Sequence, residues 1–287
     1  TVMPMPEDES SWADLNVMFA TASGNVRRNN LSDFTNIKRN GKIAMKLQDG
    51  DDLVGVLPCS DEDDVLMATR NGKAIRFAAN AVRVFRGRDS TGVRGIRLLG
   101  GDRVVSMSII ADEDNEFILS VTENGYGKRT PVNDYRRSGR GGQGVANIET
   151  SKRNGQVMAS FAVVEEDQLM LVTNMGQVIR IRVHGGEGDS IRIASRKTQG
   201  VRLFDVADDE SEKVVSAGLV RETDSDDDDD HEDNHTEGHE GDNNGDQAGD
   251  ETAETAANAP NAPAPNINDG QDDAADTPSD ADNASNQ

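Results

Sequence analysis

The chain has 287 residues, of which 34% are apolar and 3% aromatic, a composition that fits one large or two modest folded domains. No apolar run approaches the roughly 18 residues of a membrane span, the N-terminus lacks a signal pattern, and the single cysteine, Cys59, has no partner for an internal disulfide. These features exclude a membrane protein and a disulfide scaffold, and predict a cytoplasmic location.

The net charge of −23 is divided very unevenly along the chain. Residues 1–220 carry 29 basic and 31 acidic side chains, a net of −2, whereas residues 221–287 carry one basic and 22 acidic, a net of −21. The acidic average therefore describes the C-terminal segment, and it does not exclude a nucleic acid as the partner of residues 1–220.

The first 220 residues contain a fourfold repeat with spacings of 48, 53 and 51 residues, the period of propeller blades. Each repeat opens on an acidic turn, continues to a turn glycine, and has an arginine four positions after that glycine. These arginines are Arg28, Arg76, Arg129 and Arg180. The repeats occupy residues 7–60, 61–111, 112–164 and 165–220, and we predict that residues 1–6 are the last strand of a truncated upstream repeat.

The pattern inside each repeat is all-β. In the third repeat, apolar runs at residues 117–121, 127–130, 145–148 and 156–163 are separated by Gly, Asn and Asp, as strands and hairpins are. One four-stranded unit cannot bury its own sheet, so we predict face-to-face stacking in a propeller-like fold.

The strand after the turn glycine also indicates where the arginines lie. In the fourth repeat, Arg180 and Arg182 share one face of the strand, while Val178 and Ile181 lie among apolar neighbours. We therefore predict an outward-facing arginine in every repeat. The alternative is that these arginines pair with the acidic turns of neighbouring repeats.

Three patterns resemble ligand sites and fail on their context. Residues 139–144 match G-x-G-x-x-G but have no following helix, and the run from Asp224 to Asp230 lacks the glycine and glutamate of a calcium loop. The series His231, His235 and His239 lies among residues that disfavour a helix. We predict no metal, no cofactor and no catalytic residue in this chain.

Residues 221–287 are rich in Asp, Asn, Ala and Gly and cannot bury enough apolar surface to fold, so we predict a disordered tail. Two roles stay open for it. The tail solubilises the protein, or its charge imitates a phosphate backbone and competes for the basic surface of residues 1–220.

Several motifs resemble the C-terminal domain of the DNA gyrase A protein. They are TENGYGKRT at residues 122–130, YRR at 135–137, GGQG at 141–144, GVRGIRL at 92–98 and TQGVRL at 198–203. The resemblance covers residues 1–220. It implies a β-pinwheel, a strand-swapped relative of the propeller with six repeats in that family, of which four full repeats are present here. Residues 136–144 are a looser relative of the family's Q-R-R-G-G-K-G box, which belongs to an upstream repeat.

The resemblance also implies a function and partners. They are sequence-independent wrapping of double-stranded DNA, and assembly with the rest of gyrase A and with gyrase B in an A2B2 heterotetramer on the nucleoid. ATP and Mg²⁺ would be used elsewhere in that ATP-dependent topoisomerase. The near alternatives are the corresponding C-terminal domain of topoisomerase IV and a propeller-type protein-interaction scaffold.

We predict that the DNA-binding side chains come from the repeated strand and from the loop that follows it. They are Arg28, Arg76, Arg86, Arg88, Lys128, Arg129, Arg136, Arg137, Arg140, Arg180, Arg182, Arg196 and Lys197. We also predict that the loop glycines Gly139, Gly141, Gly142 and Gly144 let the backbone approach phosphates.

Overall fold

A computed structural model of the chain describes residues 3, 5–35, 39–185, 190–206 and 211–220. The chain divides after Asp228, and residues 229–287 lie entirely outside the described residues. The described part is all-β, with four short 3-10 helices at Glu9–Ala13 (η1), Leu31–Phe34 (η2), Ala79–Ala81 (η3) and Val132–Asp134 (η4).

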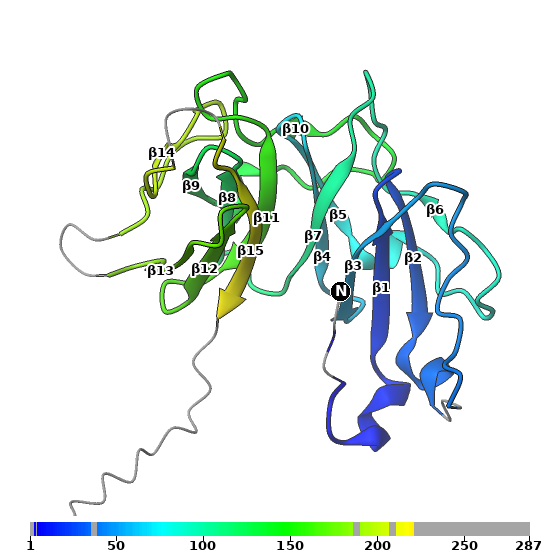
Figure 1. The fold of residues 1–287 in the computed structure, drawn as a ribbon. Coiled ribbons are helices and arrows are strands. Elements are labelled where there is room, and N and C mark those ends of the chain that lie inside the picture. The colour runs from blue at the N-terminus through cyan, green and yellow to red at the C-terminus, as the bar shows by residue number, and fades with distance from the viewer. Residues whose placement is uncertain (1–2, 4, 36–38, 186–189, 207–210, 221–287) are drawn as a thin grey trace, which may run out of the picture. The chain divides into compact units, whose positions relative to one another are not determined.

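Fifteen strands in the described residues form four antiparallel sheets (Figure 1). The first sheet has the order β3 (Leu53–Cys59), β1 (Asn16–Thr21), β2 (Asn25–Asn30), β6 (Val93–Arg94). The second is β7 (Val104–Ile110), β4 (Asp64–Thr69), β5 (Lys73–Ala78), β10 (Val145–Ala146). The third is β11 (Val157–Val163), β8 (Phe117–Thr122), β9 (Tyr126–Pro131), β14 (Val201–Arg202). The fourth is β15 (Val214–Val220), β12 (Gln168–Thr173), β13 (Val178–Arg182).

The outer strand of each four-stranded sheet comes from the following repeat. Strand β6 of the second repeat pairs with β2, β10 of the third with β5, and β14 of the fourth with β9. Each donated strand follows a glycine with positive φ, as at Gly144, where a Cβ atom would lie 2.3 Å from the carbonyl oxygen of Ala74. Only glycine allows the donated strand to approach its acceptor this closely.

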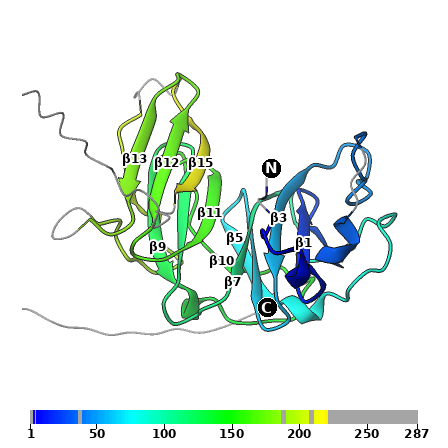
Figure 2. The same ribbon diagram turned by 90° about the horizontal axis from the view of Figure 1, so that it is seen from below.

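Apolar side chains between the sheets make one core for each pair of neighbours. Strand β4 is buried on both faces, so that Val65 and Met67 lie in the cluster toward the first sheet and Leu66 and Ala68 in the cluster toward the third. The strands that end the repeats, β3, β7, β11 and β15, pack against one another in succession (Figure 2). The propeller-like stacking that the repeats predict is therefore confirmed.

Two predictions about the chain ends fare differently. Met3, Met5 and Pro6 are described and belong to no strand, although Met3 and Met5 pack against the cluster around Trp12. The strand predicted for residues 1–6 is thus not found at those three positions. The predicted tail, with the run Asp224–Asp230 and the three histidines that follow it, lies outside the described residues.

Candidate nucleic-acid interface

Three of the four repeated arginines are buried, so the prediction that they face outward is wrong for them. Arg28, Arg76 and Arg129 are 4%, 6% and 4% exposed. Their cross-strand partners explain why: Arg76 pairs with Leu66, whose side chain lies in the core between the second and third sheets. Strand alternation places these arginines on one face, and the next sheet covers that face.

Each buried arginine binds the repeat that follows it. Arg28 pairs with Asp61 in the acidic turn of the second repeat. Arg129 pairs with Glu165 in the acidic turn of the fourth at 3.2 Å, and its Nε donates to the carbonyl of Ile191 at 2.8 Å. These contacts match the alternative reading of the sequence, in which the repeated arginines join neighbouring repeats.

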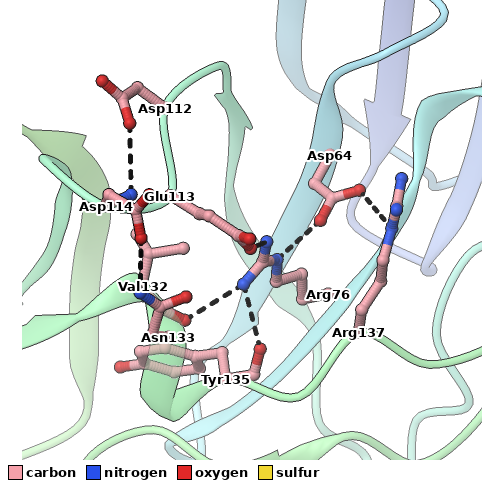
Figure 3. A network of polar contacts seen from close by, with 9 residues as sticks. All are labelled: Asp64, Arg76, Asp112, Glu113, Asp114, Val132, Asn133, Tyr135 and Arg137. Atoms are coloured by element: carbon pink, nitrogen blue, oxygen red, sulfur yellow. Dashed lines mark hydrogen bonds and ion pairs between the residues drawn. The ribbon is translucent and has the colours of Figure 1, made fainter.

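Arg76 is the centre of the most extensive of these joints (Figure 3). Its Nε donates to Asp64 at 2.7 Å and its Nη2 to Glu113 of the third repeat, while Nη1 donates to the carbonyls of Val132 and Tyr135 at 3.3 Å each. Asp64 is itself only 4% exposed. The guanidinium therefore ties the loop after η4 to the second sheet.

Arg137 approaches the same cluster from the surface. Its Nε lies 2.8 Å from the second oxygen of Asp64, an ion pair that lacks the angles of a hydrogen bond (Figure 3). The side chain is 54% exposed, so Arg137 combines a link to the buried network with a guanidinium that solvent reaches.

The strand β13 shows the outward arginines that the sequence predicts for the fourth repeat. Arg180 and Arg182 are exposed, and Arg180 Nε donates to Gln168 at 2.5 Å. Val178 was expected among apolar neighbours, but it lies on the same face and is 60% exposed. Successive side chains of a strand point to opposite faces, so residues 178, 180 and 182 lie on the same face.

Lys128, predicted to contact DNA, is fully buried. Its Nζ donates to Thr130 Oγ1 at 2.7 Å and to the carbonyl of Ser195 at 2.9 Å. Arg27 occupies the equivalent position in the first repeat, is also fully buried, and donates to the carbonyl of Ser90 at 2.7 Å. Both cations hold the chain of the following repeat in place instead of facing solvent.

The lowered pKa of Lys128 predicts that the stability of the fold depends on pH. Burial, and then the charge of Arg196, lowers the pKa of Lys128 to about 8. Between this value and the pKa of about 10.4 for an unfolded lysine, the unfolded chain binds more protons, so the free energy of unfolding rises with pH. We expect a rise on the order of 2 kcal/mol between pH 8 and 10 in urea titrations.

The variant Lys128→Met should lack this rise, because no lysine then titrates at the buried position. Lys73→Met removes an exposed lysine instead and should keep the rise. An equal pH dependence in parent and Lys128→Met would show that Lys128 is not the titrating group.

The other predicted cations lie on segments that cover the outer edge of the preceding sheet. We name residues 83–94, 136–146 and 192–202 the donated segments. The second residue of each segment forms a parallel bridge to the preceding repeat: Val84 to Arg28, Arg137 to Arg76 and Ile193 to Arg129. Each segment ends with its donated strand, β6, β10 or β14. The predicted cations on them are Arg86, Arg88, Arg136, Arg137, Arg140, Arg196 and Lys197.

Hydrogen bonds to the backbone fix several of these side chains. Arg140 Nε donates to the carbonyl of Ala81 at 3.0 Å and Nη1 to that of Arg94 at 3.1 Å, and Arg196 Nη1 donates to that of Ala146 at 3.0 Å. Arg88 and Arg196 are half-buried, and the other five are exposed. The structure thus places these predicted cations at the outer edges of the first three sheets.

Positive charge is concentrated on the donated segments, whereas the remainder of residues 1–220 is negatively charged. The three segments carry eleven basic side chains and one acidic, a net of +10, and the remainder of residues 1–220 carries 18 basic and 30 acidic, a net of −12. Four of the eleven were missed in the sequence: Arg83, Arg94, Arg192 and Arg202. Counting every basic residue from the start of each loop to the end of its donated strand would have found them.

The loop glycines have different surroundings. Gly144 has a positive φ of 71° and packs against the backbone of Ala74, so its small size serves the joint between repeats. Gly139 and Gly142 are exposed, and a Cβ atom at Gly139 would meet nothing within 4 Å. Gly141 is half-buried beside Arg94. A phosphate contact by these glycines stays a prediction.

Other kinds of site are not seen in the part of the chain that the structure describes. No group of three or more His, Cys, Asp or Glu residues there is arranged to hold a metal ion. Within the same residues, no helix has the length and apolar character needed to cross a membrane.

Stacked sheets that exchange their outer strands define a β-pinwheel, the strand-swapped class of propeller-like domains, and here the donated segments that end in the exchanged strands carry the positive charge. The chain belongs to the family described as DNA gyrase C-terminal domain, beta-propeller, whose profile matches residues 15–60, 63–111, 116–163 and 167–221. The matches cover all four repeats, and the resemblance seen in the sequence is confirmed.

Curated relatives agree with this family. The chain is 41% identical to the DNA gyrase A protein of Granulibacter bethesdensis over 79% of its length and 30% of the relative. It is 38% identical to the DNA gyrase A protein of Rickettsia bellii, over 78% of its length and 29% of the relative. The chain therefore spans about 30% of the length of these relatives.

Two solved structures share the fold. A DNA gyrase A C-terminal domain matches with a TM-score of 0.62 and 26% identity, over 72% of this chain and 66% of that one. The C-terminal domain of a DNA topoisomerase IV matches with a TM-score of 0.66 and 25% identity, over 76% of this chain and 64% of that one.

Proposed function

We propose that this chain is the DNA-binding and DNA-wrapping part of a gyrase A protein. The observation that supports it is the separation of charge, with a net of +10 on the donated segments and −12 on the rest of residues 1–220. A protein that binds a duplex without regard to sequence needs cations placed against phosphates and no side chains that read bases. The donated segments lie at the outer edges of three stacked sheets, where a bent duplex can reach them in succession.

The proposal includes the parent enzyme. Through this domain, the rest of gyrase A together with gyrase B would introduce negative supercoils at the expense of ATP, in the cytoplasm and on the nucleoid. The chain itself would supply DNA contacts and no catalytic residue, and ATP and Mg²⁺ would act elsewhere in the assembly.

The test compares two sets of four exposed cations. In the first variant of the full chain, Arg86, Arg137, Arg140 and Lys197 of the donated segments become alanine. In the matched control, Arg70, Arg103, Lys152 and Arg153, all exposed and outside those segments, become alanine. Each variant loses the same charge, so a general electrostatic effect would be equal in the two.

We expect the first variant to bind two unrelated duplexes more weakly, with the slope of log K against log salt reduced by about 0.9 for each lost phosphate contact. The control should keep a slope close to that of the parent. Equal losses in both variants, measured by fluorescence anisotropy at several salt concentrations, would reject the donated segments as the binding surface.

The topoisomerase IV reading is the second candidate, because the solved C-terminal domain of that protein has a similar TM-score. The curated relatives named above are gyrase A proteins, which favours gyrase. Joined to the remainder of gyrase A and supplied with gyrase B, the domain should support negative supercoiling of a relaxed plasmid. Relaxation without supercoiling would favour the second candidate.

A further inference from the structure

One arginine recurs at the same backbone position in all three donated segments. The residue immediately before each parallel bridge is Arg83, Arg136 or Arg192. All three are exposed. Arg136 is among the predicted DNA contacts, whereas Arg83 and Arg192 are not.

Hydrogen bonds on both sides show that the three positions are equivalent. One residue before the arginine, the amides of Val82, Tyr135 and Ile191 donate to the carbonyls of Ala79, Val132 and Val183 at 3.0, 2.9 and 3.1 Å. Two residues after it, the amides of Phe85, Ser138 and Ala194 donate to the carbonyls of Arg28, Arg76 and Arg129 at 2.8, 2.9 and 2.9 Å. The arginine is thus held between the same two backbone contacts in each segment.

Burial strengthens this anchoring. Val82, Tyr135 and Ile191, the residues just before the three arginines, are at most 4% exposed. The backbone of each arginine is therefore fixed while its side chain stays in solvent. A fixed backbone lowers the conformational entropy that is lost when the side chain binds a ligand.

The three arginines differ from the buried ones in their partners. Arg28, Arg76 and Arg129 pair with carboxylates. Among the described residues, Arg83, Arg136 and Arg192 form no ion pair with a carboxylate, and Arg83 lies over the Phe85 ring at 4.2 Å. Their charge is available to an anion that comes from solvent.

We propose that Arg83, Arg136 and Arg192 form a row of equivalent phosphate contacts, one at the outer edge of each of the first three sheets. This inference rests on the proposed DNA-binding function and specifies where its regular contacts lie. A guanidinium donates to two phosphate oxygens at once. Repeated on successive sheets with the same backbone geometry, it contacts a duplex at intervals that the stacking of the sheets determines and that do not depend on base sequence.

The test uses Arg83→Ala, Arg136→Ala, Arg192→Ala and the triple variant in the full chain, with a labelled duplex titrated at several salt concentrations. Each single variant should lower the log-log salt slope by about 0.9 and the triple by about 2.7. Arg103→Ala, an exposed arginine outside the donated segments, is the matched control and should leave the slope unchanged. Arg83→Lys and Arg192→Lys keep the charge and should retain the parent slope.

The outcomes separate this inference from the function on which it rests. If Arg136→Ala lowers the slope and the other two single variants do not, the row is rejected and the function stands. The row is also rejected, and the function stands, if none of the three single variants lowers the slope while the variant without Arg86, Arg137, Arg140 and Lys197 binds DNA weakly. If neither the triple variant nor the variant without Arg86, Arg137, Arg140 and Lys197 binds DNA more weakly when correctly folded, the proposed function fails together with the row.

Discussion

Arg76→Ala is expected to lower the free energy of unfolding by about 3–5 kcal/mol, as the loss of one partner from a buried ion pair does. The substitution leaves the buried carboxylate of Asp64 without its 2.7 Å donor and frees the carbonyls of Val132 and Tyr135. It also removes the link to Glu113 that joins the second and third repeats. Urea unfolding followed by circular dichroism measures the loss.

Arg137→Ala is the matched control for this prediction, because Arg137 pairs with the same Asp64 but is 54% exposed. Solvent screens this pair, so its loss should cost about 1 kcal/mol or less. The two variants should also differ in DNA binding. Folded Arg76→Ala should keep the parent salt slope and Arg137→Ala should reduce it. A mild effect of Arg76→Ala on stability would contradict the role of the buried arginine as a joint.

Removal of residues 221–287 is expected to tighten DNA binding, most strongly at low salt. The segment has a net charge of −21 against −2 for residues 1–220, and as part of the same chain it competes with DNA intramolecularly. Screening acts over about 10 Å at 0.1 M salt, so the gain should shrink as salt rises. Affinities of the full and shortened chains at several salt concentrations measure it.

Charge and length can be separated in this experiment. A chain of full length in which the acidic residues after position 220 become Asn or Gln should bind DNA as tightly as the shortened chain. If it binds like the parent, the segment obstructs DNA through its bulk. Equal affinity of parent and shortened chain at every salt concentration would leave the solubilising role alone.

The sequence predicts the strands well because their signals are local. Alternating apolar residues between Gly, Asn and Asp give the hairpins, and the strands β8, β9 and β11 lie within a residue or two of the expected runs. The burial of Arg76 could not be predicted in this way. Alternation puts Arg76 on the face of Leu66, but only the stacked structure shows that the next sheet covers that face.

The sequence analysis missed some of the arginines for a different reason. Arg83 and Arg136 each follow their turn glycine by eleven positions, whereas Arg192 follows Gly176 by sixteen. A longer connection between Val183 and Ile191 thus hides the equivalence of Arg192 from an alignment on the glycine. The parallel bridges that reveal it join residues more than 50 positions apart, and no local pattern reports such pairing.

The exchanged outer strands also decide how mechanical load would spread through the domain. A duplex resists bending, with a persistence length of about 150 base pairs, so a wrapped duplex pulls outward on the side chains that hold it. A donated strand such as β10 is covalently part of the third repeat but hydrogen-bonded to β5 of the second. Tension on the segment that leads into it would therefore act on two sheets at once. The elastic recoil of bent DNA would be borne by the joints between blades as well as by the blades.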